Sequence, residues 1–145
     1  MNKPRYLVFL LCLPIFVACG SIKIYEMSLP LQDISSKVPD GMTRVVFYNT
    51  TSPKFLGHGQ IVIEIDGIGG PVIRRGQYIQ VFLEPGRHAV KLEHVDPIAF
   101  TDNFSLEIEA TDTYIRVYRG LGLNRLTVQA GPPEAFTINY APIAP

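Results

Sequence analysis

The sequence contains no tryptophan, and its two cysteines, Cys12 and Cys19, both lie near the N-terminus. Within residues 20–145 no disulfide can therefore form, and neither a cysteine nucleophile nor a zinc site built from thiolates is possible. An excess of charge of one sign is also missing, because 13 Lys and Arg balance 13 Asp and Glu in 145 residues. A nucleic-acid binder needs a basic face, so we expect no nucleic acid among the partners.

The sequence also lacks the short motifs that mark common active sites. It has no GxSxG, HExxH, P-loop or GxGxxG pattern, so no nucleophile with a neighbouring base can be named. Glu107 and Glu109 alternate with apolar residues, and we expect both to be solvated on the polar face of a strand. His88 and His94 lie about 20 Å apart on one predicted strand, where we expect a solvated strand end rather than half a metal site. The prediction is a protein without enzyme activity, metal or cofactor.

The first apolar run, YLVFLLCLPIFVA at residues 6–18, follows the basic start MNKPR. As a helix this run would rise only about 20 Å, whereas the hydrocarbon core of a bilayer is about 30 Å thick. Pro14 would further weaken a spanning helix. Residues 1–18 are therefore predicted to be a secretory signal peptide, which we prefer to the alternative of a transmembrane anchor.

The run ends in FVAC, residues 16–19, which resembles the lipobox of bacterial lipoproteins. The resemblance implies that Cys19 is lipidated and becomes the first residue of the mature protein. More than one acyl chain holds a protein stably on a bilayer, and Gly20 is compatible with export to the outer membrane, facing the periplasm. The alternative is an ordinary signal peptide that is cut elsewhere.

Residues 19–42 are predicted to be the lipidated cysteine and a tether. Pro30, Pro39, Ser35-Ser36 and Asp40-Gly41 interrupt any long periodic pattern there. Fully extended, some twenty residues would reach about 70 Å. The sequence IKIY at 22–25 leaves open a short edge strand, which would shorten that reach.

From residue 43 to 130 apolar residues recur at every second position, as in half-buried strands. Turn signals, among them Asp66-Gly67, Gly69-Gly70 and Pro85-Gly86, separate the segments. We predict an all-β domain, an antiparallel β-sandwich of about seven strands. Parallel pairing is not expected, because no helical crossover is visible. The predicted strands are 43–50, 60–66, 77–84, 87–94, 103–110, 113–120 and 125–130.

Four stretches within residues 43–119 are similar to a domain of unknown function found in bacterial lipoproteins. They are VVFYNT, IEIDG, GQYIQVFLEPGRHAVKLE and FSLEIEATDTYIRVYR. That domain resembles PEGA-type modules and small transthyretin-like sandwiches. The PEGA motif itself is not reproduced, since Glu84 precedes Pro85 and Arg87 follows the glycine. The resemblance implies a non-enzymatic envelope lipoprotein and carries over no binding residue.

Two of the predicted strands carry aromatic and basic side chains on the face opposite their apolar one. Such residues dominate recognition surfaces, so this face is the candidate site for binding a protein strand or a glycan. The alternative is that the C-terminal tail or the tether covers the face. The candidate residues are Tyr78, Phe82, Tyr114, Arg116 and Tyr118.

The Pro-rich tail, residues 131–145, is predicted to be either a ligand for a partner or a packed chain end.

From the predicted anchor, the tether and the aromatic face we expect a membrane-anchored envelope lipoprotein whose sandwich has a structural role or docks another envelope protein. The alternative is the binding of a glycan or small ligand at the cell wall. A hydrolase is the least supported reading, because no nucleophile with a nearby base is present.

Overall fold

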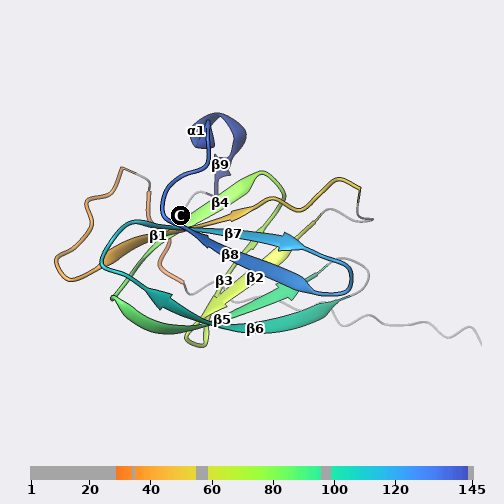
Figure 1. Ribbon diagram of the computed structural model, residues 1–145, viewed down its shortest axis with the longest axis horizontal. Helices are drawn as coiled ribbons and strands as arrows, with labels where there is room; N and C mark the ends of the chain where they lie inside the picture. The colour runs from red at the N-terminus through yellow and green to blue at the C-terminus, as the bar shows by residue number, and fades with distance from the viewer. Residues whose placement is uncertain (1–28, 34, 55–58, 96–98, 144–145) are drawn as a thin grey trace, which may run out of the picture.

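The chain folds into a two-layered β-sandwich, which confirms the predicted all-β class (Figure 1). The computed structural model describes residues 29–33, 35–54, 59–95 and 99–143. The predicted signal peptide, Cys19 and the IKIY segment lie outside these residues. Among the residues described, no helix is both long and apolar enough to cross a membrane.

One layer is a five-stranded sheet with the strand order β8-β7-β1-β4-β9, and the other is a four-stranded sheet with the order β3-β2-β5-β6. A single helical turn, α1 (Phe136–Asn139), precedes the last strand. The first sheet consists of β1 (Thr43–Asn49), β4 (Gln77–Leu83), β7 (Thr113–Arg119), β8 (Asn124–Gln129) and β9 (Ala141–Pro142). The second consists of β2 (Ile61–Ile65), β3 (Ile68–Ile73), β5 (Gly86–His94) and β6 (Phe100–Ile108).

All seven predicted strands are present, and β3 and β9 are additional. The predicted turn at Asp66-Gly67 is confirmed, since both residues have positive φ, at 50° and 81°, and join β2 to β3. The predicted turn at Gly69-Gly70 is wrong, because both glycines lie inside β3. The strand tolerates Pro71 because β3 is the outermost strand of its sheet.

The expectation of purely antiparallel pairing is also wrong, because β1 pairs with β7 in parallel and β4 pairs with β9 in parallel. A parallel pair needs a crossover connection. Between β1 and β7 the chain supplies it by passing through the four-stranded sheet, so no helix is required. The remaining pairs are antiparallel.

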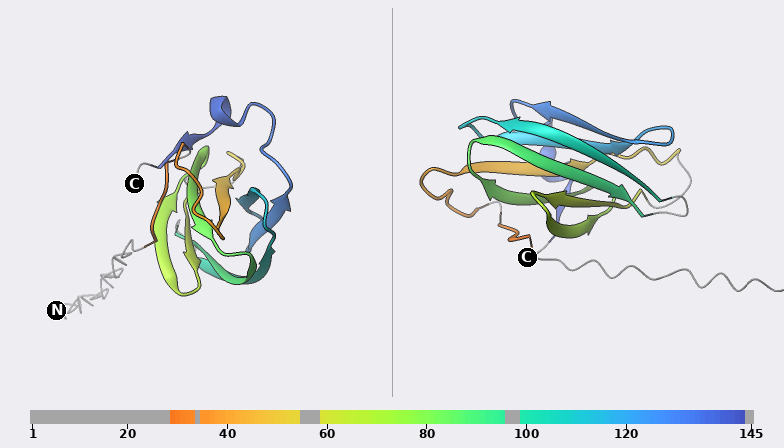
Figure 2. Two further views of the ribbon diagram at one scale, coloured as in Figure 1. Left: turned by 90° about the vertical axis from the view of Figure 1, so that its left-hand side faces the viewer. Right: turned by 90° about the horizontal axis from the view of Figure 1, so that it is seen from below.

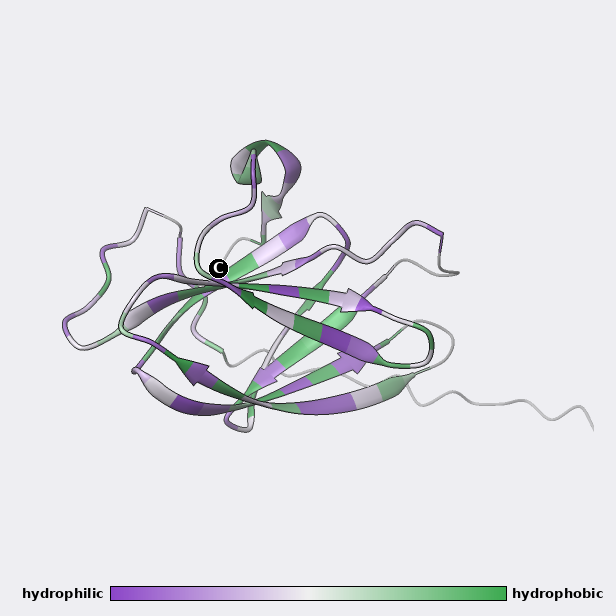
Figure 3. Cartoon of the chain, viewed as in Figure 1, coloured by the Kyte–Doolittle hydropathy of each residue, from purple (hydrophilic) through white to green (hydrophobic). Residues whose placement is uncertain are grey.

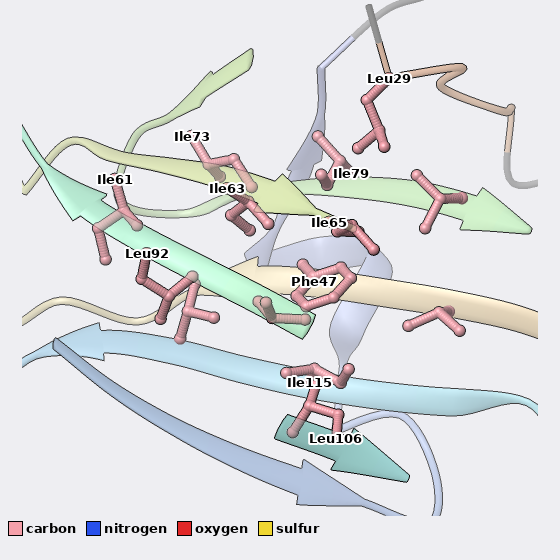
Figure 4. Packing of buried hydrophobic residues seen from close by; sticks show 14 of the residues in the cluster. Leu29, Phe47, Ile61, Ile63, Ile65, Ile73, Ile79, Leu92, Leu106 and Ile115 are labelled. Carbon is pink, nitrogen blue, oxygen red and sulfur yellow. The ribbon is translucent and has the colours of Figure 1, made fainter. Parts of the chain in front are cut away.

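The main core lies between the two sheets and is built from the apolar alternation of each strand (Figures 3 and 4). Ile61, Ile63 and Ile65 point inward from β2, as predicted, and each is at most 1% exposed. They meet Phe47 and Ile115 from the opposite sheet. Such burial contributes about 25 cal/mol for each Å² of apolar surface that leaves water, and it fixes the register of both sheets.

Residues of the expected tether also belong to the fold. Leu29 is only 6% exposed and packs at the margin of the core (Figure 4). Its backbone N–H donates to the carbonyl of Gly69 in β3 at 2.9 Å, and the N–H of Gln32 donates to the carbonyl of Gln80 in β4 at 2.9 Å. This segment therefore closes the side of the sandwich between β3 and β4.

Gly70 provides the space that Leu29 needs. A Cβ at this position would lie 2.7 Å from the carbonyl oxygen of Ile63 and 3.2 Å from Cδ2 of Leu29. Because the chain is packed from Leu29 onward, only residues 20–28 separate Cys19 from the sandwich. The ten steps from Cys19 to Leu29 span at most about 35 Å, half of the predicted reach.

A histidine joins the β2–β3 turn to β5. The Nδ1 atom of His88 lies 2.6 Å from a carboxylate oxygen of Asp66, and its Nε2 atom lies 2.8 Å from the carbonyl of Glu84. Burial lowers the pKa of His88, but the hydrogen bonds to Asp66 and Glu84 outweigh it, so the pKa is raised above its ordinary value. The hydrogen bond from His88 lowers the pKa of Asp66, which also accepts from the N–H of Ala89 at 2.9 Å.

We predict that Leu29→Ala lowers the free energy of unfolding by about 2 kcal/mol or more, because it leaves a cavity at the margin of the core. Leu121→Ala is the matched control, since Leu121 is 88% exposed, and it is expected to change stability by less than about 0.5 kcal/mol. Urea denaturation of the purified protein measures both. Equal effects of the two substitutions would show that residue 29 does not pack on the sandwich.

We also predict that stability falls as the pH rises from about 6 to 8. A histidine whose folded pKa is raised stabilises the fold below its unfolded pKa, near 6.5, and loses that contribution as the pH passes through the folded value. His88→Gln is expected to flatten this part of the curve of unfolding free energy against pH. If the wild type and the variant show the same slope, the contact with Asp66 does not stabilise the fold.

Candidate functional site

The candidate face is the outer surface of the five-stranded sheet. Side chains alternate between the two faces of a strand, so every second residue points to this surface instead of into the core. The register of the paired strands places these residues side by side in rows across the sheet. One row runs from Thr127 in β8 through Arg116 and Tyr48 to Tyr78 in β4. The predicted separation of the two faces is confirmed for β7, where Ile115 and Val117 are buried in the core.

The C-terminal tail covers the aromatic centre of this face. In Figures 1 and 2, α1 lies on the outer side of the five-stranded sheet, and the chain then continues into β9 at the edge of that sheet beside β4. Phe136 of α1 is 6% exposed. Its ring lies 4.9 Å from that of Tyr78, 5.6 Å from that of Tyr48 and 5.7 Å from that of Tyr114. Tyr140 stacks on Phe136 at 5.1 Å, so the tail and three strands share one aromatic cluster.

Burial disfavours the ionised form of the three strand tyrosines in the cluster. It is the main cause that raises the pKa of Tyr48, Tyr78 and Tyr114 above the ordinary value. The neighbouring Tyr140 raises the pKa of Tyr48 further, whereas Arg116 lowers it. The Tyr48 hydroxyl donates a hydrogen bond to Oε1 of Gln129 in β8, which satisfies a polar group at the base of the cluster.

The N-terminal segment covers another part of the same face. The side-chain amide of Gln80, itself 1% exposed, donates to the carbonyl of Asp33 at 2.7 Å. Arg44 donates to the carbonyl of Ser36 at 3.1 Å and forms an ion pair with Asp112 at 2.9 Å. The segment around residues 33–36 and the segment around residues 136–140 therefore both pack on the outer face of the five-stranded sheet.

Arg116 and Tyr118, both half-buried, form the part of the candidate face that lies beside β8. The guanidinium of Arg116 lies 4.5 Å from the centre of the Tyr118 ring, within the range of a cation–π interaction. In β8 the opposing residues are Thr127 and Arg125, both exposed. This arrangement presents hydrogen-bond donors, positive charge and an aromatic edge, a combination suited to binding rather than to proton transfer or nucleophilic attack.

The structure therefore divides the five candidate residues. Tyr78 is buried and Tyr114 half-buried under Phe136. Phe82 is half-buried at the other end of β4, opposite Arg44, and Arg116 and Tyr118 remain together beside β8. The alternative that the C-terminal tail covers the face therefore holds at Tyr78 and Tyr114. Sequence reasoning did not identify Phe136 and Tyr140 as the covering residues, although their spacing of four is a weak signal of one helical turn.

Two cavities, of about 410 and 160 Å³, lie on the side of the sandwich where β6 and β8 are the outermost strands of their sheets. The larger reaches Tyr118 of the candidate face and is otherwise lined by residues 102–104 and 123–127. The smaller is lined by Glu107, Glu109, residues 111–113 and the end of β8. Both glutamates are exposed, as predicted. Within the described ranges, no group of three or more potential ligands could hold a metal ion.

The expectation of a solvated strand end at His94 is wrong. This side chain is fully buried and stacks on Phe100 at 4.8 Å. Next to it, the backbone N–H of Asn124 donates to Asp102 at 2.6 Å, and its side-chain amide donates to the carbonyl of Leu92 at 3.0 Å. The strand end is buried because β8 begins there and closes that corner of the sandwich.

Comparison with protein-family models, with curated proteins and with solved structures finds no match to this chain.

Proposed function

We propose that this chain is a lipid-anchored protein of the bacterial cell envelope whose sandwich docks another envelope protein. The observation that carries the proposal is the pair formed by Arg116 and Tyr118 on a sheet face that is otherwise packed against the chain's own ends. Arginine and tyrosine are enriched among the residues that contribute most to protein–protein binding. A face that combines them beside an outermost strand is suited to a protein partner.

The anchor in this proposal is Cys19, with the outer membrane as its destination and the periplasm as the compartment of the sandwich. The chain joins the fold at Leu29, beside β3 and β4, and the ten residues before it limit the distance to the bilayer to about 35 Å. Arg116 and Tyr118 lie on β7, two strands away from β4. The docking residues are thus displaced from the point at which the tether arrives.

A glycan ligand at the cell wall fits this face less well. Sugars stack on open aromatic rings, but Tyr48, Tyr78 and Tyr114 contact Phe136, and the ring of Tyr118 is covered by Arg116. Failure of the protein to sediment with purified cell wall is the expected result. Sedimentation that Tyr118→Ala abolishes would favour the glycan instead.

The proposal predicts that Arg116→Ala and Tyr118→Ala each reduce the recovery of a crosslinked partner from native membranes by about tenfold, as expected for the loss of a central contact. Arg87→Ala is the matched control, because Arg87 is 80% exposed and lies on the four-stranded sheet. Crosslinking followed by purification and mass spectrometry measures the recovery. Unchanged recovery of every partner in both variants would exclude this face as the docking site.

A further inference from the structure

The C-terminal tail behaves as a ligand of the sandwich. The pocket that receives Phe136 is built from Val46 and Tyr48 of β1, Tyr78 of β4 and Tyr114 of β7, with Tyr140 of the tail beside them. Three neighbouring strands fix the floor of this pocket. The tail contributes the side chain that fills it, so the pocket is formed by β1, β4 and β7, whereas the side chain inside it belongs to α1.

Contacts at two points hold the tail. The first is the aromatic cluster around Phe136, and the second is a short strand addition to β4, where the half-buried side chain of Ile143 also packs against the margin of the main core. There the N–H groups of Ala141 and Ile143 donate to the carbonyls of Gly76 and Tyr78 at 2.8 and 2.9 Å. Between these points the residues are exposed, and Ile138 is 84% exposed. A segment with so few buried side chains opens at a lower free energy than the sandwich unfolds.

The backbone before Phe136 carries strain that release of the tail would relieve. Ala135 adopts a left-handed conformation, with φ 53° and ψ 36°, which a residue with a Cβ atom rarely adopts. The helix it precedes is a single turn without a side-chain hydrogen bond at its N-cap. The bound conformation of the tail is therefore maintained by the pocket rather than by the local sequence.

We propose that this pocket is a peptide-recognition site, that residues 136–143 occupy it within the chain, and that an aromatic peptide segment of the docked partner displaces them. The inference rests on the proposed docking function for the existence of a partner and adds the chemistry of the partner's segment. Displacement also enlarges the docking face, because Tyr48 lies directly opposite Arg116 in the paired strands.

The tail itself defines the ligand. It places aromatic rings at two positions four residues apart, Phe136 and Tyr140, and backbone donors five and seven residues after the first ring, at Ala141 and Ile143. Pro142 lies between the two donors, where an N–H would point away from β4, so proline is tolerated there. The site therefore selects an aromatic turn followed by an extended stretch that adds a strand to β4.

The test uses a fluorescent peptide of sequence PPEAFTINYAPIAP, which corresponds to residues 132–145, and the full-length protein. In Phe136→Ala the pocket loses its internal occupant, so the peptide is expected to bind this variant about tenfold more tightly than wild type, as a larger fraction of the protein is competent to bind. Ile138→Ala, in the same helical turn, is the control and is expected to behave like wild type. A peptide with alanine in place of its phenylalanine is expected not to bind.

Equal binding of the peptide to wild type and Phe136→Ala, or no binding to either, would overturn the inference. The docking function would still stand if crosslinking retains its dependence on Arg116 and Tyr118.

Hydrogen exchange of the wild-type protein supplies a measurement that does not rely on the variant. The amides of Ala141 and Ile143 are expected to exchange faster than that of Phe47 in β1, and faster again with excess peptide. Exchange at the rate of Phe47, unchanged by peptide, would contradict a displaceable tail.

Discussion

The aromatic outer face of the five-stranded sheet determines where the segments around Asp33 and Phe136 pack. A sheet in a two-layered sandwich buries one face in the core and usually leaves the other to water. Here Val46, Tyr48 and Tyr78 also place apolar surface on the outer side, and all three are at most 5% exposed. Leaving such a surface in water is unfavourable. Because no other strand covers it among the residues described, its burial depends on the segment around Phe136, with the N-terminal segment around Asp33 packed beside it.

This cover separates two parts of the molecule that have different roles in the proposal. The segment that begins at Leu29 closes the side between β3 and β4, where the proposed membrane tether would join the sandwich. Arg116 and Tyr118 lie on β7, with β1 between them and β4. At about 4.8 Å between neighbouring strands, the docking residues lie about 10 Å across the sheet from β4. A partner can therefore approach the β7 side of the sheet without displacing the segment that leads to the anchor.

The sequence predicts most of the fold because alternation is a direct consequence of strand geometry. β2 and β6 show it clearly, since Ile61 to Ile65 and Leu106 to Ile108 place every second side chain in the core. β3 escaped prediction because Gly69, Gly70 and Pro71 have the composition of a turn. The glycine at position 70 is explained by the close approach of the Ile63 carbonyl and of the Leu29 side chain, which the sequence does not show. The parallel pair of β1 and β7 could not be predicted, because it depends on a path through the other sheet rather than on any local pattern.

The candidate site was less predictable than the fold. The sequence places Tyr78, Tyr114 and Arg116 on the correct side of their strands, because the side-chain period of a strand is two. It does not show which of them are covered, since that depends on where a Pro-rich tail crosses the sheet. Residues 131–145 have no periodic pattern, and Phe136 contributes its stabilisation through three strands that are distant in sequence. Aromatic contacts of this kind stabilise by about 0.5–1.5 kcal/mol each beyond the burial of their surface.

The proposed lipid anchor at Cys19 decides in which compartment the sandwich would meet a partner. Mass spectrometry of the N-terminal peptide of the protein isolated from membranes tests this point. The account predicts that the mature chain begins at Cys19 and carries acyl chains on that residue. A mature chain that begins elsewhere, or an unmodified Cys19, would contradict it.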